Sequence, residues 1–204
     1  MPGWLVPPER FVAGLVLAAG GSSRLGRPKQ LLPYRGTTLL DWVLRTARAC
    51  EFDQLVVALG GGAPAIREAV DLGRADVVVN DQYTSGCSSS IAAGLAALDR
   101  RCDLLVLLLG DQPGVTDATV RRLVAQRADA ALAVCRYENG RGHPIAFARP
   151  VFGELAALHG DKGVWRLLER RSLDVAEVAV PGPVPLDVDT WDDYEAVLAA
   201  AGAA

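Results

Sequence analysis

A loop rich in glycine and serine, with two cations beside it, is the feature of this chain best suited to chemistry. It follows an apolar run and reads Leu17-Ala-Ala-Gly-Gly-Ser-Ser-Arg24, with Lys29 shortly after it. Glycines let backbone N–H groups approach an anion closely, and Arg24 and Lys29 add positive charge. The loop therefore predicts a phosphate-binding site. Its residue order matches neither a P-loop nor the dinucleotide-binding fingerprint.

Acidic residues occur at two other places where they could meet this loop. Asp111 follows an apolar run in Gly110-Asp-Gln-Pro113, and two more carboxylates lie in Asp187-Val-Asp-Thr190. Because Mg2+ prefers oxygen ligands, Asp111 together with Asp187 or Asp189 is a candidate Mg2+ site, and we favour Asp189. The alternatives are a turn at Asp111 before Pro113, and a solvated turn or helix cap at residues 187–189.

Two further segments carry polar groups with less specific patterns. Ser85-Gly-Cys-Ser-Ser-Ser90 is typical of a helix start, where N–H groups bind anions; Cys87 there could be a nucleophile of lowered pKa, although ordinary N-capping is the simpler interpretation. His143 is more typical of a structural hydrogen bond than of catalysis. Asp161 is a candidate N-cap, and Lys162 is a candidate anion contact.

Apolar and amphipathic segments alternate along the chain and must position these residues. Strands are predicted at Val12–Ala18, Gln54–Leu59, Asp76–Val79, Leu104–Leu109, Ala130–Cys135 and Pro144–Ala148. Helices are predicted at Thr38–Cys50, Ala63–Val70, Ser88–Arg100, Asp117–Ala128 and Asp161–Arg171. A capping box at Thr190 predicts a last helix to about Ala199, and Glu138-Asn-Gly-Arg141 predicts a turn between two strands.

This alternation predicts a three-layer, doubly wound α/β/α fold with a mostly parallel sheet. Ligands of such sheets bind beyond the carboxyl ends of the strands, so the chemistry should lie just after Ala18, Val79 and Leu109.

Length and composition fit one domain, which we place at residues 12–202 after an extension at residues 1–11. A formal net charge of -3 gives no basis for binding nucleic acid, and no apolar run is long enough to cross a membrane. The first residues lack the features of a signal peptide, and the four cysteines are widely spaced. We therefore expect a cytoplasmic protein with reduced thiols.

Taken together, these motifs resemble the nucleotidyltransferase family that includes the molybdenum cofactor guanylyl- and cytidylyltransferases. The resemblance rests on Leu17–Leu32 and on the segments at 85–90, 110–113, 142–144, 160–163 and 187–190. It covers nearly the whole chain. The first motif is shared with sugar-phosphate nucleotidyltransferases, whereas all six in this order are specific to the cytidylyltransferase-like branch.

The resemblance implies a Rossmann-like nucleotidyltransferase that transfers CMP from CTP to molybdenum cofactor, with Mg2+ on Asp111 and Asp189 and with Arg24, Lys29 and Asp111 as catalytic residues. It implies nucleotide contacts from Leu17, Ala18, Ala19, Gly20, Gly21, Ser22, Ser23, Arg24, Lys29, Asp81, Ser88 and Gly110. It implies contacts with the molybdopterin-type substrate from Ser89, Gln112, His143, Asp161 and Lys162, and transient contact with a molybdoenzyme that receives the product.

The choice of base is the finest point that the resemblance addresses. The guanylyl branch tends to read Leu-Ala-Gly-Gly where this chain has Leu17-Ala-Ala-Gly20, so CTP is favoured. An extra methyl at Ala19 would narrow the base site and disfavour a purine. The alternatives are a GTP-using enzyme, transfer to a sugar phosphate, or a carrier that binds nucleotide and cofactor without catalysis.

Overall fold

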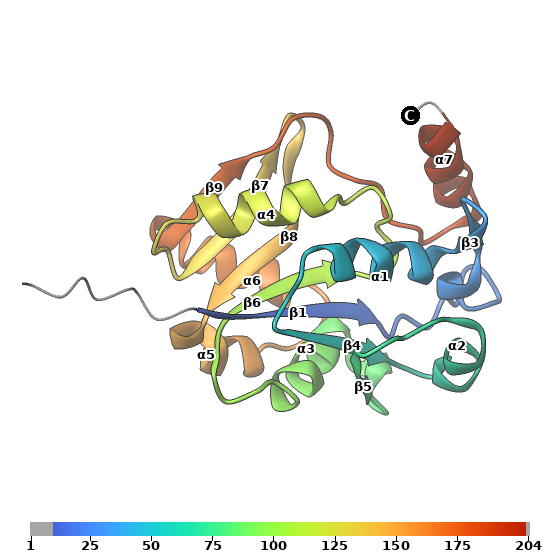
Figure 1. Cartoon of the computed structure of the whole chain (residues 1–204), viewed down its shortest axis with the longest axis horizontal. Coiled ribbons are helices and arrows are strands. Elements are labelled where there is room, and N and C mark those ends of the chain that lie inside the picture. Colours follow the sequence, from blue (N-terminus) through green and yellow to red (C-terminus); the bar gives the residue numbers. More distant parts are fainter. Residues whose placement is uncertain (1–9, 203–204) are drawn as a thin grey trace, which may run out of the picture.

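A seven-stranded sheet of order β5-β4-β1-β6-β8-β7-β9 lies at the centre of the computed structural model, which describes residues 10–202 (Figure 1). Only β8 runs antiparallel to its neighbours, so the predicted mostly parallel α/β fold is confirmed. The strands are β1 (Phe11–Ala18), β4 (Gln54–Leu59), β5 (Asp76–Val79), β6 (Cys102–Leu109), β7 (Leu132–Tyr137), β8 (Gly140–Ala148) and β9 (Val175–Ala179). A separate two-stranded ribbon joins β2 (Pro33–Tyr34) to β3 (Thr37–Thr38).

Helices cover both faces of the sheet and complete the three layers (Figure 1). One face carries α1 (Leu39–Ala49), α2 (Ala63–Ala69) and α4 (Asp117–Gln126), and the other carries α3 (Cys87–Ala96), α5 (Phe152–Ala156) and α6 (Gly163–Arg170). The last helix, α7 (Trp191–Gly202), packs on a third, smaller cluster beside the β2–β3 ribbon. Within residues 10–202, no helix is both long and apolar enough to cross a membrane.

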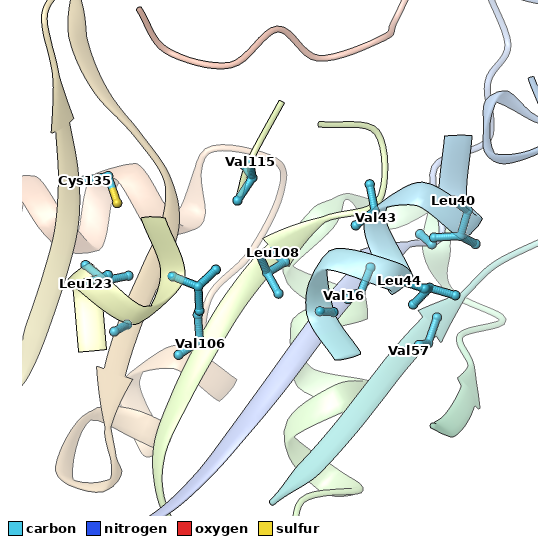
Figure 2. Close-up of a cluster of buried hydrophobic side chains, with 14 of the residues drawn as sticks. Val16, Leu40, Val43, Leu44, Val57, Val106, Leu108, Val115, Leu123 and Cys135 are labelled. Atoms are coloured by element: carbon cyan, nitrogen blue, oxygen red, sulfur yellow. The ribbon is translucent and has the colours of Figure 1, made fainter. Parts of the chain in front are cut away.

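Strand β1 shows how the sequence builds two cores at once. Val16 and Ala18 point into the cluster under α1, whereas Leu15 and Leu17 point into the cluster under α3. Because successive side chains of a strand point to opposite faces, a strand that is apolar at every position must be covered on both sides. Figure 2 shows the first cluster, in which Val16 and its strand neighbours meet helix α1.

The predicted turn at residues 138–141 is confirmed as the hairpin between β7 and β8, in which Tyr137 pairs with Gly140. Because β8 runs antiparallel to β6, it begins where β6 ends. Ile145 of β8 pairs with Leu107 of β6, so the residues just before Ile145 lie at the carboxyl edge of the parallel strands. This reversal brings His143 to the edge where ligands bind in such sheets.

The predicted capping box at the start of the last helix is also confirmed. The N–H of Asp193 donates to the Thr190 hydroxyl over 3.2 Å, and the N–H of Thr190 donates to the Asp193 carboxylate over 2.8 Å. The reciprocal pair satisfies donors that a helix start otherwise leaves open.

Several boundaries differ from the predictions. Strand β9 and helix α5 were not predicted, the helix predicted at 88–100 ends at Ala96, and the helix predicted from Asp161 begins at Gly163. Strand β1 begins at Phe11, inside the predicted extension, and residues 1–9 lie outside the described residues. Strand β9 is held by parallel pairing with β7, a contact that its short, weakly alternating sequence does not reveal.

Helix α3 packs closely on β1 at Gly94, which gives a test of the core. A Cβ added at Gly94 would lie 2.6 Å from both terminal methyls of the fully buried Leu15. We expect Gly94→Ala to lower the free energy of unfolding by about 1–3 kcal/mol, because overpacking outweighs the better helix propensity of alanine.

Urea unfolding measures this change. Gly153→Ala in α5 is the matched control, because a Cβ there meets nothing within 4 Å. Equal stabilities for the two variants would contradict the close packing of α3 on β1.

Candidate functional site

A cleft of about 590 Å³ opens at the carboxyl ends of the parallel strands, where the fold predicts a ligand site. Many of the residues expected at the site line it: Leu17, Ala18, Ala19, Gly20, Gly21, Ser22, Ser23, Arg24, Lys29, Gly110, Asp111, Asp161 and Asp189. Asp187 lines it as well. The loop after β1, the end of β6 and the segment before α7 therefore meet in one place.

Lys29 is a buried cation of this cleft that contacts carboxylates from two other segments. Its Nζ lies 2.5 Å from a carboxylate oxygen of Asp111 and 2.8 Å from one of Asp189. Burial disfavours the charge on Lys29, but the two carboxylates outweigh this effect and hold the pKa of Lys29 above its ordinary value. Lys29 is therefore a fixed cation, with 11% of its side chain exposed. Arg24 lies at the rim, 71% exposed and 3.9 Å from Asp189.

The acidic side of the cleft holds an excess of negative charge. Burial raises the pKa of the Asp111 carboxyl; Lys29 acts in the opposite direction, and Asp187 and Asp189 add to the rise. The two aspartates before α7 reach the cleft because Val188 between them is fully buried in the cluster under α7, which sends its neighbours to the other side. This arrangement leaves both Asp187 and Asp189 within the site.

The donors present suit a hard divalent cation. Within residues 10–202, no three acidic, histidine or cysteine side chains already converge as a complete metal centre. Mg2+ is commonly held by one or two carboxylates together with substrate phosphates and water, so a protein cage is not required. Asp111 and Asp189, both in contact with the same ammonium group, would supply such a partial set of oxygen ligands.

Gln30 and Ser22 fix the shape of the loop that follows β1. The Gln30 Nε2 donates to the carbonyl oxygens of Ala18, at 2.7 Å, and Gly20, at 3.2 Å. The Ser22 hydroxyl accepts the N–H of Lys29 at 2.9 Å, so the loop folds back on itself before the lysine. Gln30 was not predicted from the sequence, where its position directly after Lys29 was the only signal. In the structure its side chain is buried, with 3% of the residue exposed.

A second pocket, of about 230 Å³, adjoins the cleft and shares Cys87, Leu109, Asp161 and Asp187 with it. Gln112 and His143, two of the expected substrate residues, line this pocket and not the cleft. His143 packs edge-on against Trp165 with 5.6 Å between ring centroids, and burial lowers its pKa to about 4. His143 is therefore neutral at pH 7.

The start of helix α3 corrects three expectations, which concern its N–H groups, Asp161 and Cys87. Its first N–H groups are already used: that of Cys87 donates to the Asp161 carboxylate over 2.9 Å, and that of Ser88 donates to the carbonyl oxygen of Gly160 over 3.3 Å. They are thus not free to bind phosphate. Asp161 therefore caps α3 and not its own helix, whose first turn has no side-chain cap. Burial raises the pKa of Cys87 to about 11, which is opposite to what a nucleophile needs.

Four of the expected site residues line neither pocket. The Ser88 hydroxyl donates to the carbonyl oxygen of Gly160 over 2.6 Å. The Ser89 hydroxyl accepts from the Asn80 Nδ2 and lies within donating distance of the carbonyl oxygens of Gln82 and Gly86. Asp81 and Lys162 are exposed and lie, in the sequence, within two positions of the cleft-lining residues Tyr83 and Asp161. The serines join α3 to its surroundings, and binding roles for these four residues remain predictions.

The fold and the charged cleft define a nucleotidyltransferase-type α/β protein. The chain belongs to the MobA-like NTP transferase family, whose domain matches residues 14–175. Among curated relatives, it is 36% identical to the nicotine blue oxidoreductase of Paenarthrobacter nicotinovorans over 78% of this chain and 82% of that one. It is 29% identical to the purine catabolism protein PucB of Bacillus subtilis (strain 168), over 92% of this chain and 96% of that one.

Two solved structures are similar to this chain over nearly its whole length. Rv0371c from Mycobacterium tuberculosis H37Rv is 53% identical, with a TM-score of 0.89 over 93% of this chain and 98% of that one. A structure of Rv0371c in complex with manganese has a TM-score of 0.84 at 50% identity, over 92% of this chain and 98% of that one.

Proposed function

We propose that the protein transfers CMP from CTP to the terminal phosphate of molybdenum cofactor, giving molybdopterin cytosine dinucleotide and pyrophosphate. The observation that carries this proposal is the cleft in which Lys29 lies between Asp111 and Asp189, next to a second pocket that shares one wall with it. A two-substrate transfer needs two adjoining sites of this kind. The assignment to the MobA-like family supports the same reaction class.

In this reaction, a phosphate oxygen of the acceptor attacks the α-phosphorus, and the bond from that phosphorus to the bridging oxygen of the leaving pyrophosphate breaks. Lys29, and Arg24 at the rim, balance the negative charge that collects on the leaving group. A bound Mg2+ would supply further charge neutralisation at Asp111 and Asp189. The attacking phosphate is already ionised at neutral pH, so no general base is required, and the neutral His143 is compatible with this.

We assign the second pocket to the acceptor. Arg141 lies on its wall, but the Arg141 Nε donates to the Glu177 carboxylate over 2.6 Å, so its charge is already paired. Asp161 and Asp187 add negative charge to the same wall. This pocket thus suits an uncharged ring system with N–H donors, such as a pterin, better than a second phosphate group.

Pyrophosphate release by the purified protein, with Mg2+, molybdenum cofactor and each nucleoside triphosphate in turn, tests the proposal. We expect release with CTP. Release with GTP alone would keep the reaction and overturn the base assignment. Release with a sugar phosphate in place of the cofactor would identify the alternative acceptor. Binding without release under all conditions would indicate a carrier. We place the reaction in the cytoplasm, with transient delivery of the product to a molybdoenzyme.

Ala19 offers a test of base choice. It lies in the cleft with 6% of its surface exposed, where its methyl would limit the space for a purine. We expect Ala19→Gly to lower the ratio of kcat/KM for CTP to that for GTP by about tenfold, the typical worth of one methyl group in a pocket. Parallel initial-rate measurements with the two nucleotides give the ratio, and an unchanged ratio would rule out the methyl as the determinant.

A further inference from the structure

The cleft is charged at one end and largely uncharged at the other. Lys29 follows β1 and Asp111 follows β6, whereas Tyr83 and Thr84 follow β5, on the far side of β4 in the sheet. Of the charged residues that line the cleft, only Asp161 lies near that far end, and its carboxylate already accepts the N–H of Cys87. A nucleotide whose phosphates lie at Lys29 would therefore extend its base toward Tyr83.

Tyr83 rests on three glycines from two different loops. A Cβ at Gly61 would lie 2.4 Å from the Tyr83 hydroxyl oxygen, one at Gly60 would lie 2.9 Å from its Cγ, and one at Gly21 would lie 3.4 Å from its Cε2. None of these glycines has the positive φ that itself requires glycine. The requirement for glycine at these positions therefore comes from close packing. The Tyr83 ring leaves no room for a side chain at Gly60 or Gly61, and the Ala19 carbonyl also approaches Gly60.

The ring is fixed in place but remains half-buried on the wall of the cleft. Within residues 10–202, the Tyr83 hydroxyl makes no hydrogen bond that would fix the ring. The ring is therefore held by its packing against Gly21, Gly60 and Gly61. Fixed aromatic surface in a nucleotide site favours base stacking, because every base has a π-face and the ring loses little entropy on binding.

We propose that the nucleobase stacks on the ring of Tyr83, and that Gly60 and Gly61 hold this ring in position because neither has a side chain that would displace it. The inference rests on the proposed nucleotide site and names the residue that holds the base. It assigns Tyr83 a part in binding the nucleoside and none in binding the phosphates.

Equilibrium binding of CTP and of inorganic triphosphate, both with Mg2+, separates the two parts of the ligand. We expect Tyr83→Ala to weaken CTP binding by about tenfold, the usual effect of removing one base-stacking ring, and to leave triphosphate binding unchanged. Tyr83→Phe keeps the ring and should bind CTP like the wild type. Gly61→Ala keeps the chemistry of the ring, but its Cβ would push the ring out of position, so we expect it to weaken CTP binding while sparing triphosphate.

Thermal unfolding of each variant checks that the fold is retained, and Gly61→Ala keeps the test open if Tyr83→Ala does not fold. Equal CTP affinities for Tyr83→Ala and the wild type would overturn the inference, as would an equal loss for CTP and triphosphate. A wild-type protein that binds no nucleoside triphosphate more tightly than inorganic triphosphate would overturn it too. Tyr83-dependent CTP binding without pyrophosphate release would instead overturn the proposed reaction and keep the role of Tyr83.

Discussion

Asp111→Asn is expected to lower kcat/KM for pyrophosphate release by about 10³-fold, at the upper end of what a single preorganised electrostatic group contributes. The side chain of Asp111 is 16% exposed, contacts Lys29 directly and is a candidate metal ligand. Asparagine keeps its shape and removes its charge. Lys29 keeps Asp189 as a partner, so the fold should survive the change. The half-saturating concentration of Mg2+ should rise in the same variant.

Two comparisons make this result specific to the site. Glu68→Gln, at an exposed position of α2 outside both pockets, controls for the loss of a carboxylate as such. Asp187→Asn and Asp189→Asn, measured side by side, identify which residue shares the cation with Asp111; we expect the larger loss from Asp189→Asn. Near-wild-type turnover by Asp111→Asn would remove this residue from the mechanism.

His143 is expected to make the protein lose stability in acid. Burial lowers the pKa of His143 from 6.5 to about 4. Between these values, the unfolded chain binds a proton that the folded protein does not, so stability is full above about pH 6.5 and falls as the pH drops toward 4. The free energy of unfolding should fall by about 3 kcal/mol from this group over that range.

Replacing His143 with methionine, of similar volume and without a titrating group, should remove this part of the acid dependence. Urea unfolding at pH 7 and pH 4 measures the effect. His159→Met, at an exposed position, controls for the loss of an imidazole and should keep the wild-type dependence. If His143→Met and the wild type lose equal stability in acid, the neutral burial of His143 is not its source.

Local sequence patterns were sufficient to predict the central part of this fold. The apolar runs at β1 and β6 predicted strands, and the Asn-Gly pair predicted the β7–β8 hairpin. Asp187 and Asp189, both named from the sequence as candidate ligands, line the cleft, because the side chain between them is buried. In each case, the signal lay within a few neighbouring residues.

Contacts between distant segments could not be predicted in this way. Nothing near Asp161 in the sequence indicates that its carboxylate caps helix α3, and nothing near Lys29 shows that it will lie between Asp111 and Asp189. These pairings follow from the strand order of the sheet, which a single sequence does not reveal. Tyr83 was not predicted as a site residue for the same reason, because the glycines that it packs against come from two other loops.

The two pockets draw on largely different parts of the chain, because the reversed strand β8 brings its first residues to the carboxyl edge of the sheet. The cleft proposed for the nucleotide is lined mainly by residues within 17–30, 83–90 and 109–111, whereas residues 141–143, 164–165 and 184 line the second pocket and not the cleft. Under the proposed function, mutations in the second set would alter the binding of the acceptor and leave the nucleotide site intact. In a chain arranged in this way, the acceptor can change through substitutions in one pocket while the proposed transfer reaction is kept.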